Sequence, residues 1–132
     1  MSFGIDPSSP HEYVDETERP EFILKMEEDV LYRWLGKRAF LIERDGYYDP
    51  RIIIKMDFFE RGKKNFQKYV KLVKSKICPR WEHMKKSGLF KDMEAVYLTV
   101  LGVLIGQDVP RALAVVIAAI IARRGLDNIC RS

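Results

Sequence analysis

Residues 93–122 read MEAVYLTVLGVLIGQDVPRALAVVIAAIIA and hold the two longest uncharged runs of the chain, residues 95–107 and 112–122. A helix that is apolar on every side is usually buried in a domain or in an interface. Each run is shorter than the ~20 residues that a membrane-spanning helix needs, and one span across both would carry Asp108 and Arg111 into the bilayer. The segment therefore predicts two buried helices at the centre of the fold and argues against a membrane partner.

The segment before this centre has the pattern of an amphipathic helix. After Gly62, apolar residues recur with the 3.6-residue period of a helix until Pro79 ends it. Pro79 then opens a shorter helix that reaches Lys86. The apolar positions of the longer helix, expected to pack on the centre, are Phe66, Tyr69, Val70, Val73 and Ile77.

A second amphipathic helix is predicted near the start of the chain. Pro20 suits the first turn of a helix, and Gly36 is a natural stop. Between them, apolar residues follow a helical spacing and acidic residues occupy the other face. The residues expected to face the centre are Ile23, Met26, Val30 and Trp34, with Leu24, Leu31 and Leu35 beside them.

Residues 38–58 fit two structures. Asp45-Gly46 is a turn pair, so residues 40–48 can form a short β-hairpin. Asp49-Pro50 is a capping pair, which predicts a helix that runs to about Arg61. We expect this helix with an extended or turn segment before it, and the hairpin is the alternative for that preceding segment.

The first 19 residues differ from the rest of the chain. They carry two prolines, a surplus of acidic residues and few large apolar side chains. Such a segment cannot bury enough apolar surface to order itself, so we expect a flexible acidic tail over residues 1–19. Residues 20–132 are long enough for one domain and short for two. The predicted fold is mainly α, a single compact bundle of five or six helices.

Cys78 and Cys130 are the two cysteines of the chain. One pair does not make a disulfide scaffold, so we expect free thiols in a reducing compartment, which means a cytoplasmic location. The start of the sequence also lacks the basic and apolar regions of a signal peptide.

The sequence contains no recognisable catalytic or cofactor motif. Glycine-rich phosphate loops and the His-Glu-x-x-His pattern are absent, and Cys78 with His83 lacks an acidic partner for a nucleophilic dyad. The carboxylates of Asp45 and Asp49 could hold a divalent ion, but turn formation and helix capping explain both. We therefore expect no enzyme activity, no cofactor and no metal.

Positive charge is concentrated in residues 61–86. This segment holds ten Lys and Arg residues against the single acid Glu82, whereas the net charge of the whole chain is +4. Lysines along one surface displace counterions from phosphates, and the plain alternative is a solvated helix face. Nucleic acid, with RNA favoured, is the expected partner, read by shape because no sequence-reading motif is present. The predicted contacts are Lys63, Lys64, Lys68, Lys71, Lys74, Arg80, Lys85 and Lys86, with Tyr47, Tyr48 and Trp81 as candidate stacking groups.

A second class of function stays open from the sequence. The acidic, proline-bearing tail has the composition of a recognition segment. Ala114, Ala118 and Ala122 recur every four residues, which would let a second helix approach closely. The alternative is therefore a protein-interaction or regulatory module, which either forms a homo-oligomer through its C-terminal helices or binds an acidic protein.

Overall fold

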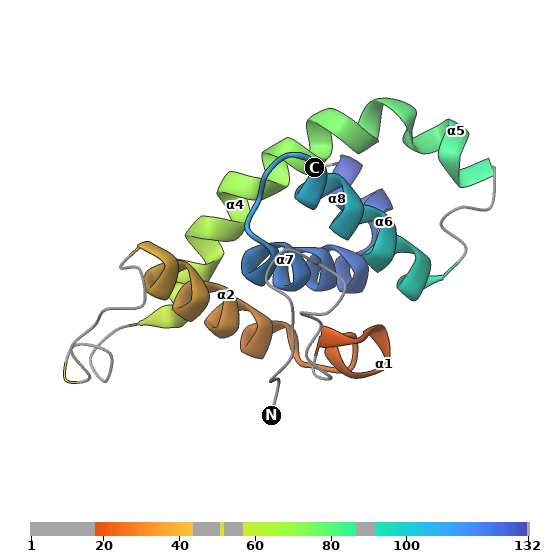
Figure 1. Ribbon diagram of the computed structural model, residues 1–132. Helices are drawn as coiled ribbons and strands as arrows, with labels where there is room; N and C mark the ends of the chain where they lie inside the picture. The colour runs from red at the N-terminus through yellow and green to blue at the C-terminus, as the bar shows by residue number, and fades with distance from the viewer. Residues whose placement is uncertain (1–17, 44–50, 52–56, 87–91, 132) are drawn as a thin grey trace, which may run out of the picture.

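Helix α7 (Arg111–Arg124) lies at the centre of the molecule, and the other helices surround it (Figure 1). The computed structural model describes residues 18–43, 51, 57–86 and 92–131. All of residues 113–122 of α7 are buried, so the predicted burial of this apolar run is confirmed. The fold is a helical bundle, and its described residues contain no strand.

The described helices follow one another in a simple order. In sequence they are α1 (Pro20–Ile23), α2 (Glu28–Glu43), α4 (Phe58–Ile77), the 3-10 turn η3 (Cys78–Arg80), α5 (Trp81–Lys86), α6 (Met93–Gly106), α7 and α8 (Leu126–Arg131). Helices α1, α2, α4, α6 and α8 all contact α7. Unlike α7, α6 buries only one face and exposes Leu98 on the other, so the prediction that both apolar helices are wholly buried holds for α7 alone.

The helix expected from Pro20 to Gly36 is broken in two. Helix α1 ends at Ile23, and α2 starts after a short turn. The turn is held from α7, because Arg123 Nη1 donates a hydrogen bond to the Leu24 carbonyl oxygen at 2.8 Å. Because α2 is a separate helix, its buried face does not continue the spacing that begins in α1. Its fully buried residues include Leu31 and Leu35. The predicted core positions Val30 and Trp34 are only partly buried.

Two glycines that were expected at helix boundaries lie inside helices instead, where they bring α2 and α4 into contact. Gly36 lies inside α2 and Gly62 inside α4, where the two helices cross. A Cβ atom on Gly36 would lie 2.0 Å from the Phe58 carbonyl oxygen, and one on Gly62 would lie 1.8 Å from the Tyr32 carbonyl oxygen. Only glycine permits this approach. The predicted helix boundaries at Gly36 and Gly62 are therefore wrong, because close packing offsets the cost of about 1 kcal/mol for a helical glycine.

The structure contradicts the first strand of the expected hairpin. Residues 40–43 are the last turn of α2, so a strand there is wrong; residues 44–48 lie outside the described residues. The prediction that a helix ends near Arg61 is also wrong, because α4 continues through Arg61 to Ile77. Helix α4 begins at Phe58 with Asp57 as its N-cap, whose carboxylate accepts the Glu60 N–H at 3.2 Å. Residues 52–56 are likewise outside the described residues.

The domain includes the end of the segment that was expected to be a tail. Residues 1–17 lie outside the described residues, but Glu18 is described and buried. Its carboxylate accepts a hydrogen bond from Arg38 Nη1 at 3.0 Å, and its backbone carbonyl accepts one from the Tyr97 hydroxyl at 2.7 Å. Burial raises the pKa of Tyr97 to about 12, so the hydroxyl keeps its proton at neutral pH.

The two cysteines form a disulfide bond. Cys78 caps the C-terminal end of α4 and is bonded to Cys130 of α8, with their Cα atoms 5.4 Å apart. The expectation of free thiols is therefore wrong, since the fold brings together positions separated by 52 residues. A cytoplasmic location, which rested on free thiols, stays a prediction. Among the described residues, no helix combines the length and the apolar character needed to cross a membrane.

Candidate nucleic-acid interface

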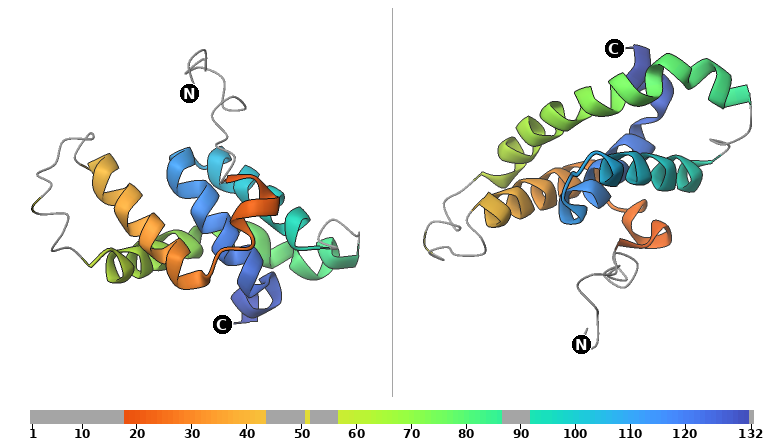
Figure 2. Two further views of the ribbon diagram at one scale, coloured as in Figure 1. Left: turned by 90° about the horizontal axis from the view of Figure 1, so that it is seen from below. Right: turned by 45° about the horizontal axis from the view of Figure 1, so that its top comes forward.

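The predicted contact residues lie on a helical arm along one edge of the molecule. Helix α4, η3 and α5 follow one another along this edge, as the views in Figures 1 and 2 show. The inner face of α4 is the apolar one, with Gly62, Phe66, Val73 and Ile77 buried. All of the basic residues predicted to bind phosphate are on this arm.

Three of these lysines share the outward face of α4. Because an α-helix turns 100° per residue, Lys64, Lys68 and Lys71 lie opposite the buried face, four and three residues apart. All three are exposed, and none forms an ion pair with a carboxylate of the described residues. We call these three residues the lysine strip. It is the part of the predicted interface that lies directly opposite the buried face of α4.

Lys63 and Lys74 lie on one flank of the strip. Both line a pocket between α4 and the C-terminal end of the chain, together with Arg124. The Lys63 ammonium also lies 5.0 Å from the centroid of the Phe59 ring, within the range of a cation–π contact. The structure thus divides the predicted α4 contacts between an outward face and a pocket.

The remaining predicted contacts continue beyond α4. Arg80 on η3 and Lys86 on α5 are exposed. Lys85 differs from them, because its ammonium lies 3.1 Å from an Asp127 carboxylate oxygen. This half-exposed pair reduces the charge that Lys85 can offer to a phosphate.

Trp81 is not available to stack on a base. Its side chain is 8% exposed, and its indole N–H donates a 2.6 Å hydrogen bond to Asp127. The prediction that Trp81 is a stacking group is therefore wrong. The indole hydrogen bond, and after it that of Lys85, lowers the pKa of Asp127. The other two stacking candidates, Tyr47 and Tyr48, lie outside the described residues.

Sequence reasoning missed a polar cluster around Arg124, the last residue of α7. Its Nε donates a hydrogen bond to the Glu28 carboxylate. Its guanidinium carbon lies 5.4 Å from the Phe66 ring centroid and 5.8 Å from that of Tyr32. Burial raises the pKa of Tyr32 to about 12, so the phenol stays neutral. In the sequence, Arg124 indicates only the end of a helix. Its partners come from two other helices, α2 and α4, so the sequence did not predict the cluster.

The described residues include both members of the dyad considered in the sequence, Cys78 and His83. The Cys78 sulfur is bonded to Cys130, so it provides no thiolate for a dyad with His83. Within the described part of the chain, no three His, Cys, Asp or Glu residues are grouped so that they could hold a metal ion. Asp57 serves as a helix cap, and Glu43 pairs with Arg61 at 3.3 Å.

The fold and the surface together describe a general class of protein, a helical domain with a basic outer arm. No protein family model, no curated protein and no solved structure matches this chain.

Proposed function

We propose that this chain is a non-enzymatic nucleic-acid-binding protein that binds RNA through the lysine strip. The observation that carries the proposal is the outward position of Lys64, Lys68 and Lys71 on a helix whose opposite face is buried. Lysines in such a row can follow a phosphate backbone and release its counterions. Lys63, Lys74, Arg80 and Lys86 extend the positive surface on either side.

The proposal favours RNA because the strip provides charge and shape but no base-reading motif. Recognition of RNA through its shape and its backbone needs no base-reading motif. Recognition of a DNA sequence would require side chains that enter the major groove.

A charge-reversal experiment tests the proposal. The triple variant Lys64→Glu, Lys68→Glu and Lys71→Glu should bind a short single-stranded RNA much more weakly than wild type. For wild type, log affinity should fall linearly with log salt, and each lost phosphate contact should reduce the slope by ~0.7 for a single strand. Fluorescence anisotropy of labelled RNA over a salt series measures both quantities.

A matched triple provides the control. Lys25→Glu, Arg33→Glu and Lys37→Glu make the same change in net charge at exposed positions outside α4, η3 and α5. Arg33 loses only a surface pair with Asp29, which contributes about 0.5 kcal/mol. Normal RNA binding by the strip variant, or an equal loss in both triples, would overturn the proposal.

One observation favours self-association as a second candidate function. Ala114, Ala118 and Ala122 are buried within the domain, so they cannot form the contact that the sequence suggested. Helix α6 instead exposes Leu98 at 51% and Met93 at 44%. Leu98→Lys should convert a dimer to a monomer in sedimentation velocity. A wild-type protein that remains monomeric as its concentration is raised would exclude this candidate.

A further inference from the structure

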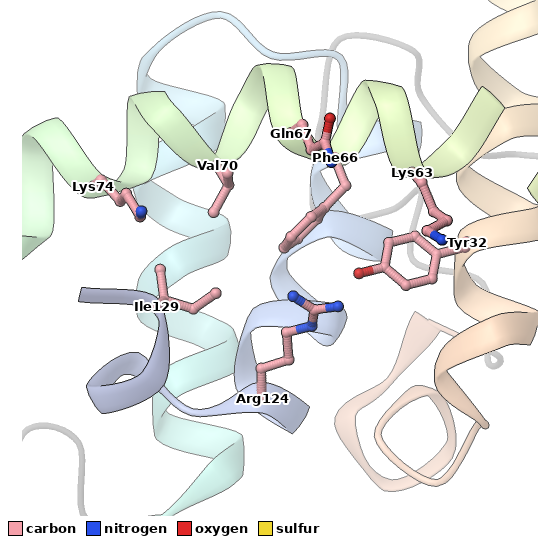
Figure 3. Close-up of a pocket in the computed structure, with 8 residues that line it drawn as sticks. All are labelled: Tyr32, Lys63, Phe66, Gln67, Val70, Lys74, Arg124 and Ile129. Carbon is pink, nitrogen blue, oxygen red and sulfur yellow. The ribbon is translucent and has the colours of Figure 1, made fainter. Parts of the chain in front are cut away.

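A pocket of about 160 Å³ lies beside the lysine strip, between α4 and the C-terminal end of the chain (Figure 3). Its apolar floor consists of Phe66 and Val70 from α4 and Ile129 from α8. In Figure 3, Val70 and Ile129 point toward one another across this floor. The volume is close to that of a cavity that binds benzene, ~150 Å³. The pocket therefore has room for one planar ring.

Three basic side chains line the rim of this pocket, and one of them, Arg124, is paired with Glu28. Lys63 and Lys74 reach it from α4, and Arg124 faces them from the opposite wall. No described carboxylate lines the pocket. Lys63 and Lys74 are three helical turns apart, about 16 Å along the axis, so they stand at its two ends. Gln67 lies between them and can both donate and accept a hydrogen bond.

Arg124 is held in place before any ligand binds. Its Nε donates a hydrogen bond to Glu28, and its guanidinium group lies against the rings of Phe66 and Tyr32, which also contact each other (Figure 3). Folding has therefore already restricted the rotamers of this side chain. A ligand that contacts Arg124 loses less affinity to ordering than it would with a mobile arginine.

We infer that this pocket receives one unstacked base of a single-stranded nucleic acid whose backbone follows α4. The inference rests on the proposed function and adds the kind of strand that is bound. The base enters over Val70, with the buried Phe66 and Ile129 beneath it, and Lys63 and Lys74 meet phosphates of the strand at the two ends of the pocket. A base within a duplex cannot enter, because it is stacked and paired. The pocket thus selects single strands over duplexes.

The first test compares two ligands of equal charge. One is a short single-stranded RNA, and the other is a ribose-phosphate strand of the same length without bases. Wild type should bind the base-bearing strand severalfold more tightly, because only that strand places a base in the pocket. Val70→Trp, which fills the pocket, should abolish this preference and leave binding of the baseless strand unchanged. The strip variant should weaken binding of both.

A pair of lysine variants gives a second test that does not depend on the fold of Val70→Trp. Lys74→Gln and Lys76→Gln each remove one charge from α4, but only Lys74 lines the pocket. Affinity for the base-bearing strand should fall more in Lys74→Gln than in Lys76→Gln, because only Lys74 stands at the pocket that the strand crosses. An unchanged preference in folded Val70→Trp, or equal behaviour of the lysine variants, would overturn the base pocket while the proposed function stands. If wild type binds neither strand, the proposed function itself fails.

Discussion

The two ends of α4 are held by different means. Near its N-terminal end, Gly62 lies directly against the backbone of α2, where the Tyr32 carbonyl oxygen leaves no room for a side chain. At its C-terminal end, Cys78 is bonded to Cys130 of α8. The first attachment depends on the absence of atoms, and the second depends on a covalent bond. The Gly62 contact is therefore sensitive to any added side chain, and the disulfide is sensitive to reduction.

Both attachments act through the inner side of α4 and through its end. The outward face is therefore not needed to hold the helix, and the lysine strip can occupy it without cost to the core. This separation allows each attachment and the candidate interface to be altered independently.

The largest effect is expected from Gly62→Ala. A Cβ atom 1.8 Å from a carbonyl oxygen forces two backbones apart, and we expect a loss of about 5 kcal/mol or more, enough to unfold an ordinary domain. Urea unfolding followed by circular dichroism measures it.

Gly102→Ala is the matched control for this substitution. Gly102 lies in α6, and a Cβ there meets no atom within 4 Å. This variant should be more stable than wild type by up to about 1 kcal/mol, because alanine favours a helix. Equal responses of Gly62 and Gly102 would show that the crossing of α2 and α4 is not as close as described.

The next effect is expected from Cys130→Ser. Closing a loop of 52 residues restricts the unfolded chain, which corresponds to about 4 kcal/mol in the loop-entropy model. Urea unfolding with and without a reductant measures the loss. The reductant should destabilise wild type and leave Cys130→Ser unaffected. A wild type that ignores the reductant, although its thiols become accessible to a labelling reagent, would contradict this prediction.

The smallest effect is a change of stability with pH at the contact between α5 and α8. The Trp81 indole, and after it Lys85, lowers the pKa of Asp127. The resulting stabilisation is present above the ordinary pKa of a carboxyl group, about 4. It is lost as the pH falls through the lower pKa of the folded state. Asp127→Asn should therefore show a shallower loss of stability in acid, measured from urea midpoints at several pH values. Identical acid slopes would argue against the hydrogen bond to Trp81.

Much of the local structure could be predicted from the sequence. The end of α4 before Pro79 and the short helix up to Lys86 are as expected, since proline acts on its immediate neighbours. The phase of α2 was wrong, because the spacing was extended across a turn after Ile23 that Arg123 stabilises from α7. Leu31 and Leu35, predicted at the edge of the apolar stripe, are therefore its fully buried residues, and Val30 and Trp34 lie at its edge.

The candidate site was predictable only in part. The lysines of the strip belong to one helix, so their shared face follows from their spacing. Trp81 was assigned to the surface because nothing nearby in sequence indicates Asp127 as its partner. The pocket was missed for the same reason, as its walls come from α2, α4, α7 and α8.

By itself, the amino-acid sequence determined that this protein is helical, that residues 113–122 lie inside it, and that positive charge gathers on residues 61–86. These properties depend on neighbours within a few turns of helix. Only the tertiary structure decided that Gly36 meets Gly62, that Cys78 meets Cys130, and that Arg124 faces Lys63 and Lys74 across a pocket. Each of these contacts depends on how close two separate elements come, and that distance is set by the packing of the whole domain.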